Sequence, residues 1–132
     1  MMMRMLGIDY GGRRVGTALS DDAGTMAFPH KILENNKRLV DDIGDLVKKE
    51  QVTRIVVGLP RALGDMHDTD MTGEVRAFAK SLESFGVPVE LEDEFLSSSE
   101  VTRQGGTKGA IDASAAAIIL QSYLERRKNM LL

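Results

Sequence analysis

The chain has 132 residues, 42% of them hydrophobic and 28% charged, which is the composition of one globular domain rather than of a disordered or fibrous protein. It contains no cysteine, so disulfides and thiolate metal sites are excluded, and a metal would need oxygen ligands or the two histidines, His30 and His67. The formal net charge of −3 argues against nucleic-acid binding by a broadly basic surface, although a bound divalent cation would reverse the sign locally.

The sequence shows no sign of export or membrane insertion. The N-terminal stretch reaches an acid at Asp9, too early for the apolar region of a signal peptide. No apolar run approaches the roughly 18 residues that a membrane span requires. We therefore expect a soluble, cytoplasmic protein that has no membrane partner.

Three strands and a helix are predicted in the first half of the chain. Residues 4–10 are typical of a buried strand, and residues 13–22 alternate and end in a polar turn, which predicts a hairpin. A third short strand over 25–33 is restricted to an edge or a bulge by Pro29, which lacks a ladder N–H. Over 35–51 the apolar residues recur with helical period, and Asn35 or Asn36 is available as the cap.

The second half alternates strands and helices. Residues 53–60 are the most apolar, β-branched strand, followed by a polar loop over 61–70 and an amphipathic helix over 72–86 that Gly86 ends. Residues 87–93 form a further strand that finishes in acids. Ser-x-x-Glu at 97–100 has capping-box spacing and predicts a short helix. An alanine-rich helix runs from Asp112 to about Lys128.

This order of elements predicts a single α/β domain over residues 1–132. A hairpin followed by strands that helices connect implies a mixed sheet with helices on its faces. Ligands in such sheets bind beyond the carboxyl ends of the parallel strands. Residues at the ends of these elements are therefore the candidates for a functional site.

Acidic residues occur at three such ends. Asp9 ends the first strand, Asp93 and Glu94 end the strand over 87–93, and Asp112 begins the final helix. Clustered carboxylates repel one another unless a cation joins them, and hard oxygen ligands favour Mg²⁺ or Mn²⁺. Two such ions can bind the attacking and leaving oxygens of a phosphoryl displacement.

Each acid also has an ordinary structural interpretation. Asp9 can simply start a turn, where aspartate is common. Asp93 or Glu94 can be an exposed strand end, and Asp112 suits a helix N-cap. The metal hypothesis depends on the combination of acids at one predicted edge.

At this point the sequence resembles the YqgF/RuvX nucleases of the RNase H-like superfamily, which are related to Holliday junction resolvases. The matching stretches follow the family's order and cover nearly the whole chain; they are GIDYGGRRVGTALSD at 7–21, VVGLPRALGD at 56–65, VRAFAKSLE at 75–83, DEFLSSSE at 93–100 and KGAIDASAAAIILQSYLE at 108–125. The resemblance implies one RNase H-like domain with a mixed five-stranded sheet flanked by helices.

The resemblance also implies an activity. It is divalent-metal-dependent phosphodiester hydrolysis that matures the 5′ end of precursor 16S ribosomal RNA, with structured RNA as substrate and a possible ribosomal or pre-ribosomal partner. Carried over residue by residue, the family's catalytic and metal-binding acids (with Mg²⁺ or Mn²⁺) are Asp9, Glu94 and Asp112, and Asp93 becomes a neighbour. Two positions depart from the family pattern: Gly12 replaces a threonine, and Phe95 replaces an arginine, which removes a phosphate contact.

Basic residues in the connections near the predicted edge are candidates for binding substrate phosphates. They are Arg13, Arg14, Arg61, Arg103 and Lys108, the last two bracketing a glycine-rich loop. Taken one at a time, each of these residues is better explained as a solvated surface cation, whereas as a group in these loops they are equally consistent with a rim that binds substrate.

Three alternative functions remain open. A Holliday junction resolvase acting on branched DNA would normally be a symmetric dimer, and the sequence does not decide between a monomer and a homodimer. A catalytically weak RNA-binding factor is consistent with Gly12 and Phe95. A nucleotide-binding module is suggested by Asp-Tyr-Gly-Gly at 9–12, but 132 residues leave no room for a second lobe.

Overall fold

The computed structural model describes residues 3–61, 72–95 and 108–130. The strands are β1 (Met5–Asp9), β2 (Arg14–Ser20), β3 (Ala27–Glu34), β4 (Arg54–Arg61) and β5 (Val89–Phe95). The helices are α1 (Leu39–Lys49), α2 (Thr72–Ser81), the 3₁₀ turn η1 (Leu82–Phe85) and α4 (Lys108–Met130). The short helix predicted at 97–100 and most of the predicted loop, residues 62–70, lie outside the described residues.

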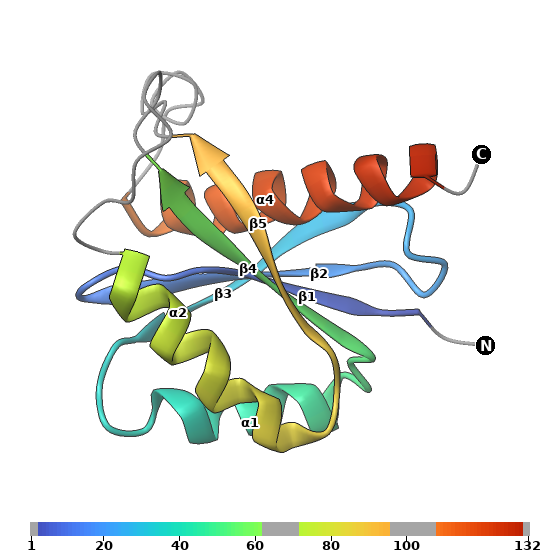
Figure 1. The fold of residues 1–132 in the computed structure, drawn as a ribbon. Coiled ribbons are helices and arrows are strands. Elements are labelled where there is room, and N and C mark those ends of the chain that lie inside the picture. Colours follow the sequence, from blue (N-terminus) through green and yellow to red (C-terminus); the bar gives the residue numbers. More distant parts are fainter. Residues whose placement is uncertain (1–2, 62–71, 96–107, 131–132) are drawn as a thin grey trace.

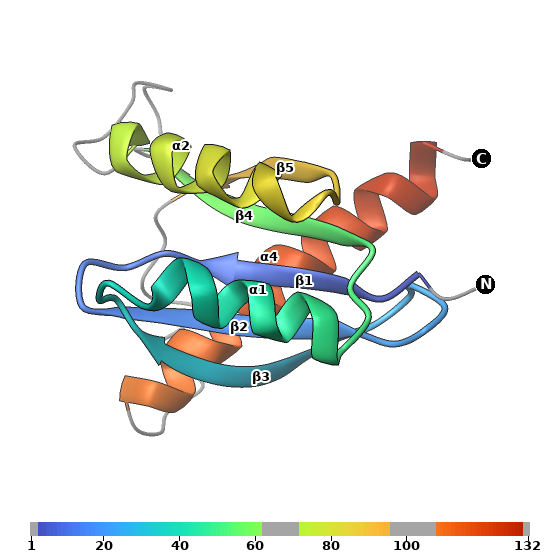
Figure 2. The ribbon, with the colours of Figure 1, turned by 90° about the horizontal axis from the view of Figure 1, so that it is seen from below.

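The strands form one five-stranded mixed sheet in the order β3-β2-β1-β4-β5. β2 is antiparallel to β1 and to β3, whereas β1, β4 and β5 are mutually parallel. Helices α1 and α2 cover one face of the sheet and α4 covers the other (Figures 1 and 2). This confirms the predicted α/β fold and brings the carboxyl ends of β1, β4 and β5 to one edge.

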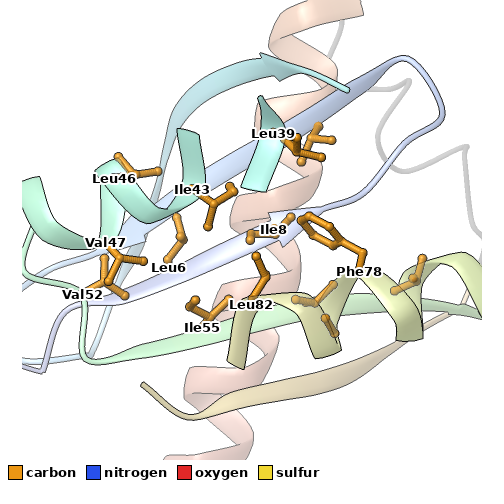
Figure 3. Close-up of a cluster of buried hydrophobic side chains, with 14 of the residues drawn as sticks. Leu6, Ile8, Leu39, Ile43, Leu46, Val47, Val52, Ile55, Phe78 and Leu82 are labelled. Carbon is orange, nitrogen blue, oxygen red and sulfur yellow. The ribbon is translucent and has the colours of Figure 1, made fainter. Parts of the chain in front are cut away.

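The larger hydrophobic core lies between the sheet and helices α1 and α2 (Figure 3). Alternate residues of β1 and β4 point into it, as the two-residue strand period requires. The helices contribute apolar residues at three- and four-residue spacing, which is the apolar helix face that the sequence predicts. Its fully buried members include Leu6, Ile8, Ile43, Ile55 and Leu82.

The second core lies between the sheet and α4. The helix contributes Ala116, Leu120 and Leu124, and the sheet contributes Met5 and Val56, among others. A Cβ atom on Gly7 would lie 2.7 Å from the Cβ of Leu120 and 3.0 Å from the carbonyl oxygen of Ala116. The absence of a side chain at residue 7 therefore lets α4 pack directly on the backbone of β1.

Pro29 lies where the sequence predicts, on the edge strand β3 beside an irregularity. It pairs with Ala18, next to a shift of register between Gly16 and Ala18. The hydroxyl of Thr17 accepts a hydrogen bond from the Lys31 N–H at 3.0 Å and donates one to the Lys31 carbonyl at 2.7 Å. The Thr17 side chain thus satisfies the N–H and the carbonyl of Lys31, beside the irregularity in the β2–β3 pairing.

Two helix starts differ from prediction. The N-cap of α1 is Arg38, which makes no side-chain capping bond, so the predicted Asn35 or Asn36 cap is wrong. Asn36 instead accepts a hydrogen bond from the Arg38 N–H at 2.9 Å, two residues on, as asparagine does in turns. Helix α4 begins at Lys108 rather than Asp112, so Asp112 lies inside the helix and cannot be its N-cap.

His30 is a half-buried residue of β3 that interacts electrostatically with Lys49 and Glu50 at the C-terminal end of α1, and it provides a test of stability against pH. Its Nε2 atom is buried without a hydrogen-bond partner among the described residues, and burial lowers the pKa of its imidazole. Glu50 opposes this lowering, while Lys31, Lys49 and Arg4 add to it. The folded pKa therefore lies below the unfolded value of about 6.5.

A histidine whose pKa is depressed on folding contributes its stability fully above the unfolded pKa, and this contribution is lost as the pH falls through the folded pKa. We expect the urea midpoint of the wild type to fall between pH 7.5 and 5.5, and the His30→Gln variant to show a smaller fall. Equal pH dependence in the wild type and in His30→Gln would contradict the assignment to His30.

In the described part of the chain, no helix is both long and apolar enough to cross a membrane.

Candidate active site

Asp9 is the last residue of β1, half-buried at the carboxyl edge of the sheet. The turn that follows it is tightly fixed. A Cβ atom on Gly11 would lie 2.4 Å from the carbonyl oxygen of Arg14, so only glycine fits there. Asn35 donates its side-chain amide to the Gly11 carbonyl at 2.7 Å and its backbone N–H to the Arg13 carbonyl at 2.9 Å. The backbone beyond Asp9 is therefore held in one position before any ligand binds.

At Gly12, by contrast, a Cβ atom would meet nothing within 4 Å. Its side-chain position is exposed. The departure from threonine at this position therefore removes a hydroxyl without relieving a steric restriction. The geometry of the turn does not require glycine at residue 12.

Glu94 lies in β5, paired with Pro60 of the neighbouring parallel strand β4. Two and four residues earlier on the same strand, Glu92 and Glu90 contact α4. Asp93 is exposed and, two residues beyond Leu91, shares the strand face that packs against the α1–α2 core, so it lies on the face opposite to Glu90 and Glu92. The side chain of Glu94 lies outside the described side chains.

The direction of α4 relates Asp112 to Asp9. The C-terminal half of the helix packs near the start of β1, since Met5 clusters with Leu124. The N-terminal half of the helix therefore lies toward the carboxyl edge of the sheet (Figure 1). Asp112 is one turn before Ala116, which contacts Gly7, and Asp9 is two residues beyond Gly7. Both steps span about 6–7 Å toward the same edge. The topology therefore brings the backbone positions of residues 9 and 112 to one end of the β1–α4 contact.

The complete ligand set of a metal centre stays a prediction. Among the side chains that the structure describes, no group of three or more acids, histidines or cysteines could hold a metal ion. Of the three predicted ligands, only Asp9 belongs to those side chains. His30 belongs to the edge strand β3, and the charges that act on it include Lys49 and Glu50 at the C-terminal end of α1.

Four of the five predicted substrate-binding cations belong to segments at this carboxyl edge. Arg13 is exposed in the turn after Asp9, and Arg14 is the half-buried first residue of β2. Arg61 ends β4 and Lys108 begins α4, and their side chains lie outside the described ones. Arg103 lies outside the described residues.

The sequence interpretation missed one polar feature of this region, the pairing of Glu92 with α4. Glu92 is buried, and its carboxylate accepts hydrogen bonds from Arg126 at 2.5 Å and from Ser122 at 3.2 Å. A signal was available, because glutamates at 90, 92 and 94 alternate along one strand. Such a pattern gives one face of a strand a row of carboxylates that need partners.

Solved structures that share this RNase H-like fold include RuvC and a viral resolvase. The structure matches Thermus thermophilus RuvC with a TM-score of 0.62 at 13% identity, over 96% of this chain and 97% of that chain. It matches fowlpox virus resolvase, solved with Holliday junction DNA, with a TM-score of 0.55 at 11% identity, over 94% and 98% of the two chains. At these identities the likeness establishes the fold, a mixed five-stranded sheet flanked by helices.

Sequence comparison identifies the family. The model of the family described as "RuvX: Holliday junction resolvase" matches residues 3–126, so the chain belongs to the RuvX family. A relative from Maridesulfovibrio salexigens, named "Putative pre-16S rRNA nuclease", is 39% identical over 94% of this chain and 99% of its own length. A relative of the same name from Nitratidesulfovibrio vulgaris is 40% identical over 92% and 93% of the two chains.

Proposed function

We propose that the protein is a divalent-metal-dependent nuclease that hydrolyses phosphodiester bonds in structured RNA and processes the 5′ end of precursor 16S ribosomal RNA in the cytoplasm. The observation that carries the proposal is the arrangement of β1, β5 and α4. These three elements, which carry Asp9, Glu94 and Asp112, all reach the carboxyl edge of the sheet in a member of the RuvX family.

The donor set fits Mg²⁺ or Mn²⁺. All three residues offer carboxylate oxygens, which are the ligands these hard cations prefer. Asp9 lies on the α4 side of the sheet, because strand residues alternate and Gly7 contacts that helix. Glu94 shares its strand face with Glu90 and Glu92, which contact the same helix. Bound metal would supply a hydroxide nucleophile and stabilise the charge on the leaving oxygen.

The position of Asp112 favours a functional role over a structural one. Aspartate is a poor helix former, and at an N-cap it would be explained by the cap alone. Helix α4 begins four residues earlier, and its first turn contains no acid, so the cap explanation does not apply. An acid inside the helix, one turn before the contact with β1, is accounted for by a ligand role.

The chain's own cations would orient the RNA backbone at this edge. Arg13 lies in the fixed turn after Asp9 and Arg14 directly follows it, Arg61 ends β4 and Lys108 begins α4, and Arg103 belongs by sequence to the undescribed connection between β5 and α4. Lys108 adds its charge to the N-terminus of α4, where the helix dipole is already positive. Such an arrangement attracts phosphate, and it holds the scissile group beside the carboxylates.

RNA is favoured over branched DNA because of the relatives. Those at 39% and 40% identity carry a ribosomal RNA nuclease name, whereas the solved resolvases with Holliday junctions are far more distant. The family description keeps the junction resolvase as the second candidate. A junction enzyme would need two sites in a symmetric dimer, whereas an RNA-processing enzyme can act as a monomer.

Cleavage of the two substrates by one preparation separates these candidates. With Mn²⁺ we expect the protein to cut a 16S precursor carrying its 5′ leader, alone or on pre-ribosomal particles, and to leave a synthetic four-way DNA junction intact. Light scattering reports the oligomeric state of the same sample. Cleavage of the junction by a dimer, with the precursor uncut, would replace the proposal by the resolvase.

A further inference from the structure

A network of paired charges joins β5 to α4. Glu92 is bound by Arg126 and Ser122, as described above, and Glu90 is bound by the hydroxyl of Tyr123 and by Arg54 of β4, the latter at 2.7 Å. We call these six residues the β5–α4 network. The Tyr123 hydroxyl and Arg54 hold the pKa of the Glu90 carboxyl below its usual range, and Glu92 raises the pKa of Arg126. The network contains two carboxylates and two guanidinium groups, so its charges balance.

Apolar packing does not join β5 to α4 in the described part of the chain. The buried core under α4 draws its sheet residues from β1, β2 and β4, at Met5, Ala18 and Val56. In the part of the chain that the structure describes, β5 contributes no residue to that core. Two apolar residues of β5 whose side chains the structure describes, Val89 and Leu91, pack instead against the core on the other face. Contact between β5 and α4 therefore depends on directional polar bonds.

The same two elements carry two of the proposed metal ligands. Glu94 is two residues beyond Glu92 on β5, and Asp112 belongs to α4. Any rotation or sliding of α4 against β5 changes the separation between these two acids. Hydrogen bonds of fixed length and angle resist such movement more specifically than apolar contacts, which tolerate sliding.

We propose that Glu92 and Arg126 are positioning residues that fix α4 against β5 and thereby set the affinity of the active site for divalent cations. The proposal rests on the proposed function, since it takes Asp9, Glu94 and Asp112 as the ligands. Neither Glu92 nor Arg126 contacts the metal in this arrangement. They act through the placement of the strand and the helix that carry the ligands.

Direct Mn²⁺ binding, measured by electron paramagnetic resonance without substrate, tests the proposal. We expect Arg126→Met to raise the dissociation constant by about tenfold or more, the range seen when groups behind metal ligands are removed. Arg126→Lys should recover part of the affinity, because a single nitrogen, Nη2, makes the bond to Glu92. Glu92→Gln should weaken binding less than Arg126→Met, because it keeps an acceptor for Ser122.

The matched control is Arg4→Met. Arg4 also bridges a strand to neighbouring elements, with bonds to Asp22 at 2.8 Å and Glu50 at 2.9 Å, but it precedes β1 at the opposite edge of the sheet. This variant should lose stability while its Mn²⁺ dissociation constant stays within about twofold of the wild type. Thermal denaturation of every variant identifies a temperature at which all of them are folded, and Mn²⁺ binding is measured there.

The outcomes distinguish failure of the proposed metal-dependent function from failure of the positioning role of Glu92 and Arg126. If the wild type binds no Mn²⁺, the proposed function fails. If the wild type binds Mn²⁺ and Arg126→Met binds it equally well, the proposed function stands and the positioning role is wrong. An equal loss of affinity in Arg4→Met and Arg126→Met would also overturn the inference, because it would assign the effect to general stability.

Discussion

Replacement of Asp9 by asparagine is expected to abolish metal-dependent cleavage of RNA while leaving the protein folded. The substitution keeps the shape of the side chain and removes one negative charge from a proposed metal ligand at the end of β1. A metal ion stabilises the transition state of phosphodiester hydrolysis by several kcal/mol. Since about 1.4 kcal/mol corresponds to a tenfold change in rate, we expect a loss of roughly a hundredfold or more.

Thermal unfolding with and without Mn²⁺ distinguishes loss of a ligand from loss of the fold. A cation that binds only the native state stabilises it by about 2.7 kcal/mol at a hundred times its dissociation constant. The wild type should therefore melt several degrees higher with Mn²⁺, and Asp9→Asn should not respond. Without metal the variant should still unfold in one cooperative transition, because the substitution keeps the shape of the side chain.

Asp93→Asn is the matched control for this experiment. Asp93 is an exposed acid next to Glu94, it pairs with Leu59 across the β4–β5 ladder, and alternation gives it the other face of the strand. It should cleave RNA at the wild-type rate and retain the response to Mn²⁺. Glu94→Gln and Asp112→Asn should behave like Asp9→Asn. Wild-type cleavage by any of these three would remove that residue from the ligand set.

The sheet could be predicted from the sequence because its signals are local and strong. Pro29 restricted β3 to an edge or a bulge, and the helix-connected strands implied a mixed sheet, which the structure confirms with β1, β4 and β5 parallel to one another. The end of the second helical segment was equally legible, since Gly86 adopts a left-handed conformation with φ of 80°. A strand or helix that has a clear hydrophobic period, together with a proline or glycine that constrains its position or its end, allows few alternative assignments.

Helix starts were less predictable because several residues competed for the same role. Asn35 and Asn36 both suited the cap of α1, yet one fixes the turn after Asp9 and the other bonds the N–H of Arg38. Likewise, Asp112 is a good N-cap in isolation, but the helix continues back through Gly109 to Lys108. Local propensity cannot rank such options, because tertiary contacts between distant segments choose among them.

The pairing of Glu92 with Arg126 could not be predicted from the sequence, because it also depends on tertiary packing. The two residues are 34 positions apart, and their contact depends on how α4 crosses the sheet. The local sequence around neither residue determines the angle at which α4 crosses the sheet. The three predicted ligands rest on the order of the elements, which the sequence could supply, whereas the surrounding network requires the packing of α4.

Gly7→Ala is expected to destabilise the protein and to impair cleavage together, because one added methyl group would separate α4 from β1. The new Cβ would lie 2.7 Å from the Cβ of Leu120, a contact that rotation of a side chain cannot relieve. Overpacking of this kind costs about 1–3 kcal/mol. The displaced helix also carries Asp112 away from Asp9, and a shift of about 1 Å at an active site can cost about a hundredfold in rate.

Gly73→Ala is the matched control, because a Cβ atom at this exposed position of α2 would meet nothing within 4 Å. It should stabilise the helix by up to about 1 kcal/mol and leave cleavage unchanged. Urea denaturation and Mn²⁺-dependent cleavage, measured on both variants, make the comparison. A Gly7→Ala protein as stable and as active as the wild type would mean that α4 does not rest on the backbone of β1, and the spatial relation between Asp9 and Asp112 would lose its structural basis.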